Sequence, residues 1–406
     1  MPSFLLLFLS LGLAMVTPAT AQPAPVRLGV DVLFAEKLDL LKGKRVGLLT
    51  HAGGVDGDLE PTLDRFLREP RLNVVQLYAP EHGLHAATPN GTSTAAGKDD
   101  ASRLPIEGLF GKQTSPSPAS LARVDVIVID LQDIGSRTYT YATTLGKVMV
   151  AAAAAKVAVM VLDRPNPQGG VKFEGPIRKP RWKSLIGWGP LPVTHGLTMG
   201  ELARFYEAEL RLGCTLTVIE MQGWKRQMQW EDTGLHWVPS SPGIPHSLNA
   251  HFYVATGMVG GSGANVNEGG GNSMPFELIG APYLNPRALF EALQAQKLPG
   301  VRFRPMTFRP WRGQFAGKIV HGVQLLLTDR QAFLPLRTAL AILTALQKTH
   351  PEEFRVGDEQ RFGRVWGDMV ILDQVRAGRT WQQIESGWQT DLADFAKKRE
   401  KSLLYP

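Results

Sequence analysis

Residues Val124–Asp130 (VDVIVID) decide the fold of this chain, because they form a short apolar run that ends in an acidic residue. Similar β-rich runs occupy Arg45–Thr50 (RVGLLT), Asn73–Tyr78 (NVVQLY), Val157–Leu162 (VAVMVL) and Cys214–Glu220 (CTLTVIE). Helical patterns lie between them at Pro61–Arg68, Tyr139–Ala155 and Thr198–Leu210. Continuous apolar strands separated by helices are typical of a parallel sheet covered on both faces. The sequence therefore predicts an α/β fold built on a Rossmann-like, doubly wound parallel sheet.

The pattern changes after residue 280, where a smaller mixed α+β domain is expected. Helices are predicted at Pro286–Gln296 and Gln331–Thr349, strands at Val301–Phe303 and Ile319–Leu327, and two shorter helices near the end of the chain. We therefore divide the mature chain into residues 22–280 and residues 281–406. A loop-rich stretch, Trp224–Pro282, precedes the second domain, and its many apolar residues indicate an ordered segment.

Residues 1–21 are predicted to be a cleaved signal peptide. An apolar run, Phe4–Val16, is followed by the small-residue cleavage pattern Ala19-x-Ala21. A periplasmic or secreted protein is the expectation, and a buried N-terminal helix is the alternative. The run Phe4–Val16 is too short to span a bilayer, no other run reaches about 20 apolar residues, and no cysteine lies near the cleavage site, so no stable membrane anchor is expected.

Composition excludes several classes of protein. The 406 residues are 44% hydrophobic and 20% charged, unlike a disordered, collagen-like or coiled-coil chain. Cys214 is the single cysteine, which excludes an intrachain disulfide and a cysteine-rich metal site. The net charge is +7, but no basic run occurs, so we expect no nucleic-acid partner.

The sequence indicates neither a cofactor nor a metal. The first strand runs into Thr50–Gly54 (THAGG), which has no G-x-G-x-x-G pattern, and no Walker A sequence occurs. Glu81 and His85 share a short segment but lack the H-E-x-x-H spacing of a zinc site.

Polar segments follow three of the predicted strands. They are Ala79–Gly83 (APEHG), Asp130–Tyr141 (DLQDIGSRTYTY) and Asp163–Pro167 (DRPNP). In open parallel sheets, ligands bind beyond the carboxyl ends of the strands. Three polar strand ends at one edge therefore predict a polar binding site there.

These motifs carry a family resemblance that covers nearly all of the chain after residue 21. The chain resembles the NamZ family of exo-β-N-acetylmuramidases in the three segments above and in five further ones. These are Phe173–Pro176 (FEGP), His195–Ala203 (HGLTMGELA), Asn267–Pro282 (NEGGGNSMPFELIGAP), Phe308–Pro310 (FRP) and Leu403–Tyr405 (LLY). The resemblance implies a secreted glycoside hydrolase that releases N-acetylmuramic acid from the non-reducing ends of peptidoglycan fragments. It also implies an active cleft between the two domains.

The chain departs from the family pattern in three loops. Gly261–Ala264 replaces a Phe-Glu-Gly-Thr stretch, Gly269–Asn272 replaces Gly-Arg-Gly-Thr, and Leu84–Ala86 replaces Phe-Arg-Gly. A catalytically impaired periplasmic binding protein for cell-wall sugars is therefore the alternative function. An oxidoreductase is a third hypothesis, which the missing dinucleotide pattern disfavours.

Glu81 and Glu174 are the predicted catalytic residues. Glycosidic bond cleavage needs a proton donor, and an N-acetyl sugar can supply its own acetamido oxygen as nucleophile while a second carboxylate orients it. Glu81 follows a strand at the ligand edge and is the predicted acid, with helix capping or a lysine pair as its structural alternative. Glu174 is the second carboxylate, in competition with Asp130, Asp133 and Asp163.

The remaining predicted site residues would bind the sugar. His82 would supply a hydrogen bond, and Arg137 or Arg164 would pair with the lactyl carboxylate of muramic acid or, alternatively, with Asp130 or Asp163. Other predicted pocket residues are Tyr139, Tyr141, Asn166 and His195, and Trp224, Trp230 and Trp237 would stack on sugars or pack in the core.

Overall fold

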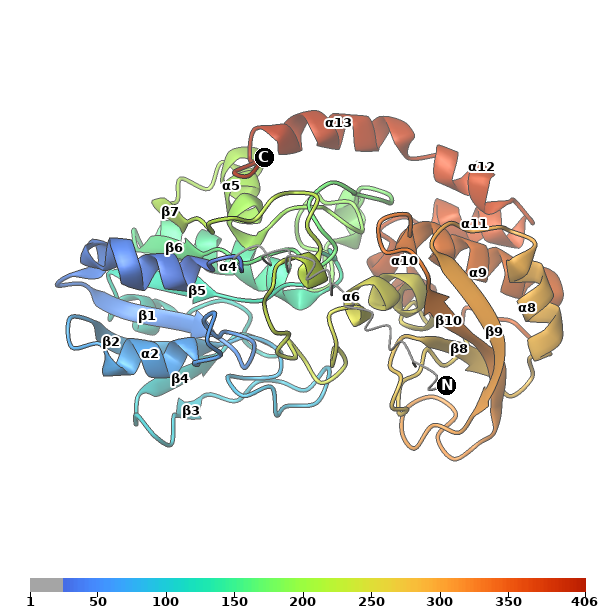
Figure 1. The fold of residues 1–406 in the computed structure, drawn as a ribbon, viewed down its shortest axis with the longest axis horizontal. Helices are drawn as coiled ribbons and strands as arrows, with labels where there is room; N and C mark the ends of the chain where they lie inside the picture. The colour runs from blue at the N-terminus through green and yellow to red at the C-terminus, as the bar shows by residue number, and fades with distance from the viewer. Residues whose placement is uncertain (1–24) are drawn as a thin grey trace, which may run out of the picture.

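The structure is a computed structural model that describes residues 25–406. The predicted signal peptide, residues 1–21, lies outside the described residues. The chain folds into two domains that lie side by side (Figure 1).

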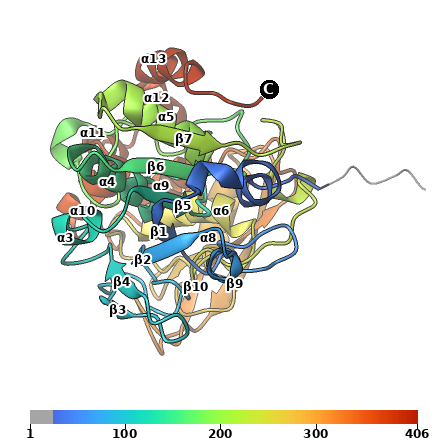
Figure 2. The ribbon, with the colours of Figure 1, turned by 90° about the vertical axis from the view of Figure 1, so that its left-hand side faces the viewer.

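The first domain contains a seven-stranded sheet of order β3-β4-β2-β1-β5-β6-β7. Its strands are β1 (Arg45–Thr50), β2 (Asn73–Ala79), β3 (Gly97–Lys98), β4 (Pro105–Gly108), β5 (Val126–Asp130), β6 (Ala158–Leu162) and β7 (Leu216–Ile219). All neighbouring strands are parallel except β3 and β4. Figure 2 shows the labels in this order from β7 at the top to β3 at the bottom.

Helices cover both faces of this sheet, which confirms the predicted doubly wound fold. Ile127 and Ile129 of β5 pack with the core under α4 (Thr140–Ala154) and α5 (Met199–Leu210). Val126 and Val128 point to the opposite core. That core includes α1 (Gly29–Val32) and α2 (Thr62–Arg68), and the remaining short helices of this domain are η1 (Leu33–Lys37), η2 (Leu38–Leu41), α3 (Pro118–Leu121), η3 (Pro180–Trp182) and η4 (Trp230–Asp232).

The second domain packs helices against a three-stranded antiparallel sheet of order β8-β10-β9. Its strands are β8 (Leu278–Ala281), β9 (Val301–Phe308) and β10 (Val320–Leu327). Its helices are α6 (Asn249–Phe252), η5 (Tyr253–Gly257), α7 (Met258–Gly260), α8 (Pro286–Gln294), α9 (Pro335–Thr349), α10 (Glu359–Trp366), α11 (Val370–Arg376), α12 (Trp381–Ser386) and α13 (Gln389–Glu400). Four helices rather than two therefore close the chain.

The structure places the start of the second domain near residue 249. The boundary expected after residue 280 falls inside β8, which pairs with β10 of the second sheet. Upstream of it, α6, η5 and α7 share an apolar core with α9. Residues 249–280 therefore belong to the second domain, because their apolar side chains are buried there.

The last helix connects the second domain back to the first. At the start of α13, Trp388 and Leu392 pack in the core of the second domain, whereas Phe395 packs against Phe205 of α5. Figure 1 shows α13 running from α12 toward α5. None of the helices in residues 25–406 is long and apolar enough to cross a bilayer.

Candidate functional site

Glu81 lies two residues beyond the end of β2, and both oxygens of its carboxylate accept a hydrogen bond. The Gly91 amide donates to Oε1 over 2.9 Å, and the Thr140 hydroxyl donates to Oε2 over 2.7 Å. Thr140 is the first residue of α4. The half-buried side chain is therefore fixed between a surface loop and the start of a helix.

His82 is held beside Glu81 in a left-handed backbone conformation, with φ at 73°. Its ring is buried, and Nδ1 lies 2.9 Å from the carbonyl oxygen of Thr88. Since a carbonyl oxygen only accepts, Nδ1 carries the proton of this bond. The loop that reaches Glu81 through Gly91 therefore also orients the neighbouring imidazole.

Both residues line a pocket of about 160 Å³, here called the Glu81 pocket, to which both domains contribute. The second domain supplies Tyr253 and Phe276, whose rings are 5.0 Å apart, and the Tyr253 hydroxyl donates to the carbonyl of Thr138 over 3.2 Å. The first domain supplies Glu81, His82, Asn90, Thr138, Tyr139, Thr140, Ile186, Ser241, Gly243 and Ile244. Glu81 is the only carboxylate among these lining residues, and none of them is lysine or arginine.

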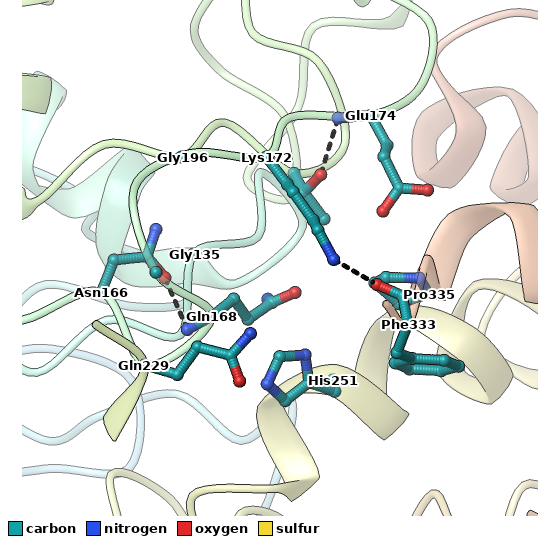
Figure 3. A pocket seen from close by; sticks show the side chains of 12 residues that line it. Gly135, Asn166, Gln168, Lys172, Glu174, Gly196, Gln229, His251, Phe333 and Pro335 are labelled. Carbon is teal, nitrogen blue, oxygen red and sulfur yellow. Dashed lines mark hydrogen bonds between the residues drawn. The ribbon is translucent and has the colours of Figure 1, made fainter. Parts of the chain in front are cut away.

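Glu174 lies in a different pocket, shown in Figure 3 with Lys172 and His251. This pocket has a volume of about 10 Å³, which is close to the space that one water needs. Glu174 Oε2 accepts a 3.3 Å bond from the Arg337 amide in the first turn of α9, whose N-cap residue provides no side-chain cap. Burial raises the pKa of Glu174 to about 7. The structure therefore places the two predicted catalytic carboxylates in separate pockets.

Asp130 and Arg164 form a buried ion pair, with Arg164 Nε 2.5 Å from Asp130 Oδ1. The Thr62 hydroxyl donates to the other carboxylate oxygen, and Arg164 also donates to the carbonyl of Val55. The pair joins β5 to the segment after β6. Of the two alternatives given for Arg164, a lactyl carboxylate or a neighbouring aspartate, the structure shows the pair with Asp130.

Arg137 is also buried, and its guanidinium donates to three backbone carbonyls. These belong to Pro176, Leu191 and, from the second domain, Val365, at 2.7 to 3.1 Å. Burial lowers the pKa of Arg137 to about 9. Arg137 and Arg164 do not line the Glu81 pocket, so the structure gives neither guanidinium a path to a lactyl group bound there.

Asp163 holds the start of α5 and the end of the chain. It accepts hydrogen bonds from the Thr198 hydroxyl, the Gly200 amide and the Tyr405 hydroxyl. Burial raises the pKa of Asp163 to about 7. These donors surround the carboxylate of Asp163. The residue therefore stabilises the fold and does not line the Glu81 pocket.

The other predicted residues are divided between packing and the two pockets. Tyr139 lines the Glu81 pocket and donates to the Ser240 hydroxyl over 3.0 Å, whereas Tyr141 is fully buried behind it. Asn166 lines the Glu174 pocket, and the buried His195 lies 3.6 Å from Asp133. Trp224 and Trp230 are buried in the core, and Trp237 packs edge-on against Trp230.

Several contributors to the Glu81 pocket and its support were not predicted from the sequence, among them Gly91, Thr140, Tyr253 and Phe276. Thr140 lies within a motif that we singled out, and its position at the start of a predicted helix beyond a strand was the available signal. Tyr253 and Phe276 come from the other domain, and no local pattern links them to Glu81. Among residues 25–406, no three His, Cys, Asp or Glu side chains are grouped so as to hold a metal ion.

Comparison with known proteins matches both domains. Two family models, the N-terminal and C-terminal domains of exo-β-N-acetylmuramidase NamZ, match residues 46–248 and 251–405. The peptidoglycan β-N-acetylmuramidase NamZ of Bacillus subtilis is 38% identical over 386 residues, which are 95% of this chain and 93% of that protein. Two crystal structures of DUF1343 family proteins from Bacteroides fragilis superimpose with TM-scores of 0.88 and 0.76, at 35% and 26% identity. Each alignment covers 94% of this chain and 99% of the other.

Proposed function

The chain belongs to the NamZ family and is a glycoside hydrolase, and on that premise we propose that it releases N-acetylmuramic acid from the non-reducing ends of peptidoglycan fragments. The observation that carries the proposal is the Glu81 pocket, with one fixed carboxylate in a small space between two domains. We further propose that it works in the periplasm or outside the cell, as residues 1–21 indicate.

The size of the pocket supports exo action. Its volume of about 160 Å³ lies below the roughly 300–1,000 Å³ of sites that enclose drug-sized ligands. Such a space takes the end of a glycan rather than several consecutive sugars. An enzyme that cuts within a chain needs an open groove instead.

Glu81 is the one carboxylate that lines the pocket, so no second carboxylate is there to act as nucleophile or to orient the acetamido group. We therefore propose that the acetamido group itself is the nucleophile and acts without that partner. Glu81 gives its proton to the glycosidic oxygen as the bond to C1 breaks, and the carbonyl oxygen of the sugar's 2-acetamido group attacks C1. Water then opens the resulting ring, and the Glu81 carboxylate takes up the proton that water releases. In this proposal His82, which is buried and oriented by Thr88, forms a hydrogen bond with the sugar.

The test uses a chromogenic β-glycoside of N-acetylmuramic acid and soluble glycan strands. Wild-type protein should cleave the chromogenic substrate, and Glu81→Gln should reduce kcat by about 10²–10⁴-fold, because a general acid contributes that much. Glu174→Gln is the matched control, a carboxylate in the other pocket, and should stay within tenfold of wild type. Glu81→Gln above a tenth of wild-type kcat would show that Glu81 is not the acid.

Product size tests the exo mode. Glycan strands should yield monosaccharide steadily while the polymer shortens slowly. Rapid formation of mid-length fragments would contradict exo action and indicate cleavage within the chain. Tight binding of the sugar by wild-type protein without any turnover would instead favour the alternative function, a binding protein for cell-wall sugars.

A further inference from the structure

The connection between β9 and β10, residues 309–319 (RPWRGQFAGKI), combines an exposed tryptophan with unopposed positive charge. Trp311 is 66% exposed, the largest fraction among the exposed large hydrophobic side chains of the described residues. Arg309, Arg312 and Lys318 are exposed too, and the segment contains no acidic residue. We call residues 309–319 the basic loop. An exposed indole beside several cations offers both a flat apolar face and positive charge to a ligand.

The basic loop is held in place through its backbone. The Trp311 amide donates to the carbonyl of Gly271 over 2.9 Å, and the Asn267 side chain donates to the carbonyl of Gln314 over 2.8 Å. None of its three cations takes part in the ion pairs found within residues 25–406. The three cations therefore form no ion pair within the described residues. They and the exposed Trp311 ring can contact a ligand.

The loop also lies against a segment that forms one wall of the Glu81 pocket. Residues 268–276 make a closed turn, because the Phe276 amide donates to the carbonyl of Glu268 over 2.8 Å. Phe276, at one end of this turn, lines the Glu81 pocket. Gly271, near the tip of the turn, contacts Trp311. The basic loop is therefore attached to the same turn that supplies Phe276 to the Glu81 pocket.

We propose that the basic loop binds the part of an anionic glycan strand that remains outside the Glu81 pocket. Trp311 supplies a flat face for a sugar ring, and the three cations pair with carboxylates of muramic acid or of peptide stems. This inference rests on the proposed function, because it assumes a peptidoglycan strand whose end is in the pocket. The loop adds affinity for the polymer without touching the bond that is cleaved.

The test compares a long substrate with a short one. Trp311→Ala, and separately the triple change Arg309→Gln, Arg312→Gln and Lys318→Gln, should each raise KM for glycan strands about three- to tenfold. The kcat/KM for a chromogenic N-acetylmuramic acid glycoside should stay within twofold of wild type, because that substrate does not reach the loop. Trp311→Phe should retain most of the polymer affinity.

The matched control carries the same change of charge at a distant surface. Lys37→Gln, Lys42→Gln and Lys44→Gln remove three exposed cations from the first domain and should leave KM for the polymer unchanged. An equal rise of KM in this control would show a net-charge effect and overturn the proposal. So would unchanged polymer KM in both loop variants, or an equal loss on both substrates.

Binding to insoluble peptidoglycan gives a readout that does not need turnover. Co-sedimentation with purified cell-wall sacculi should weaken three- to tenfold in both loop variants, and this result holds even if wild-type protein cleaves nothing. Inactivity of wild-type protein on both substrates would refute the proposed function alone. Loss of binding to anionic phospholipid vesicles, with binding to sacculi unchanged, would assign the loop to a membrane surface and overturn the proposal.

Discussion

Asp130→Asn should destabilise the protein strongly without a specific effect on sugar binding. Asp130 and Arg164 are almost completely buried, and their closest atoms are 2.5 Å apart. The substitution leaves the Arg164 guanidinium charged in the interior and without its partner. Breaking a buried pair in this way costs about 3–5 kcal/mol. The Tm of a domain of 150–250 residues falls by about 2–4 °C for each kcal/mol of stability that is lost, so the expected fall in Tm is about 6–20 °C.

The control is Asp125→Asn, which breaks a second Arg–Asp pair with similar geometry at the surface. Arg45 and Asp125 lie 2.8 Å apart but are more than 40% exposed. An exposed pair contributes about 0–1 kcal/mol, so Tm should fall by less than about 4 °C. Both variants are measured by calorimetry, and KM is measured well below either Tm. A wild-type Tm for Asp130→Asn together with a raised KM would refute a structural role for Asp130.

Three further predictions concern residues placed away from the Glu81 pocket. Because the native pKa of Glu174 is about 7 against an ordinary 4.5, the native state holds a proton there that the unfolded state has released, so this group lowers stability as pH rises from about 4.5 to 7. The Tm of wild-type protein minus that of Glu174→Gln should therefore fall across this window and level off above it, and a constant difference would contradict the buried position. Arg137→Lys should lose at least about 2 kcal/mol of unfolding free energy in urea, since the single nitrogen of an ammonium cannot reach the carbonyls that two nitrogens of the planar guanidinium contact, and the turnover ratio of muramic acid to N-acetylglucosamine glycosides should not change. Tyr405→Phe should cost about 1–3 kcal/mol in the same assay, because Asp163 loses a buried donor, and unchanged stability would contradict that contact.

The regular part of the fold could be predicted because burial on both faces leaves a direct trace in the sequence. Every residue of β5 is buried, so the strand appears as an uninterrupted apolar run. The edge strand β3 has two exposed residues, and its neighbour β4 has four residues, two of them only half-buried, so both are too short for such a run and were missed. The domain boundary could not be predicted because α6 and β8 pack against residues far along the chain, in α9 and β10.

The site could be predicted only to the level of the sheet edge. The rule on strand ends points to the polar segments after β2, β5 and β6. It does not separate a side chain that lines a pocket, such as Tyr139, from one that joins two strand ends, such as Arg164. That difference depends on the register between strands: Ile129 of β5 lies opposite Val161 of β6, which brings Asp130 within reach of Arg164. A sequence pattern along one segment does not contain this information.

The path of α13 limits how the two domains move. The chain passes from the first domain to the second near residue 249 and returns through α13, whose last residues and Tyr405 are anchored in the first domain. These two covalent crossings act together with buried bonds between the domains, such as the bond from Arg137 to the carbonyl of Val365, and fix the orientation of one domain against the other. Because both domains form the walls of the Glu81 pocket, its width is set by this double attachment rather than by a single linker.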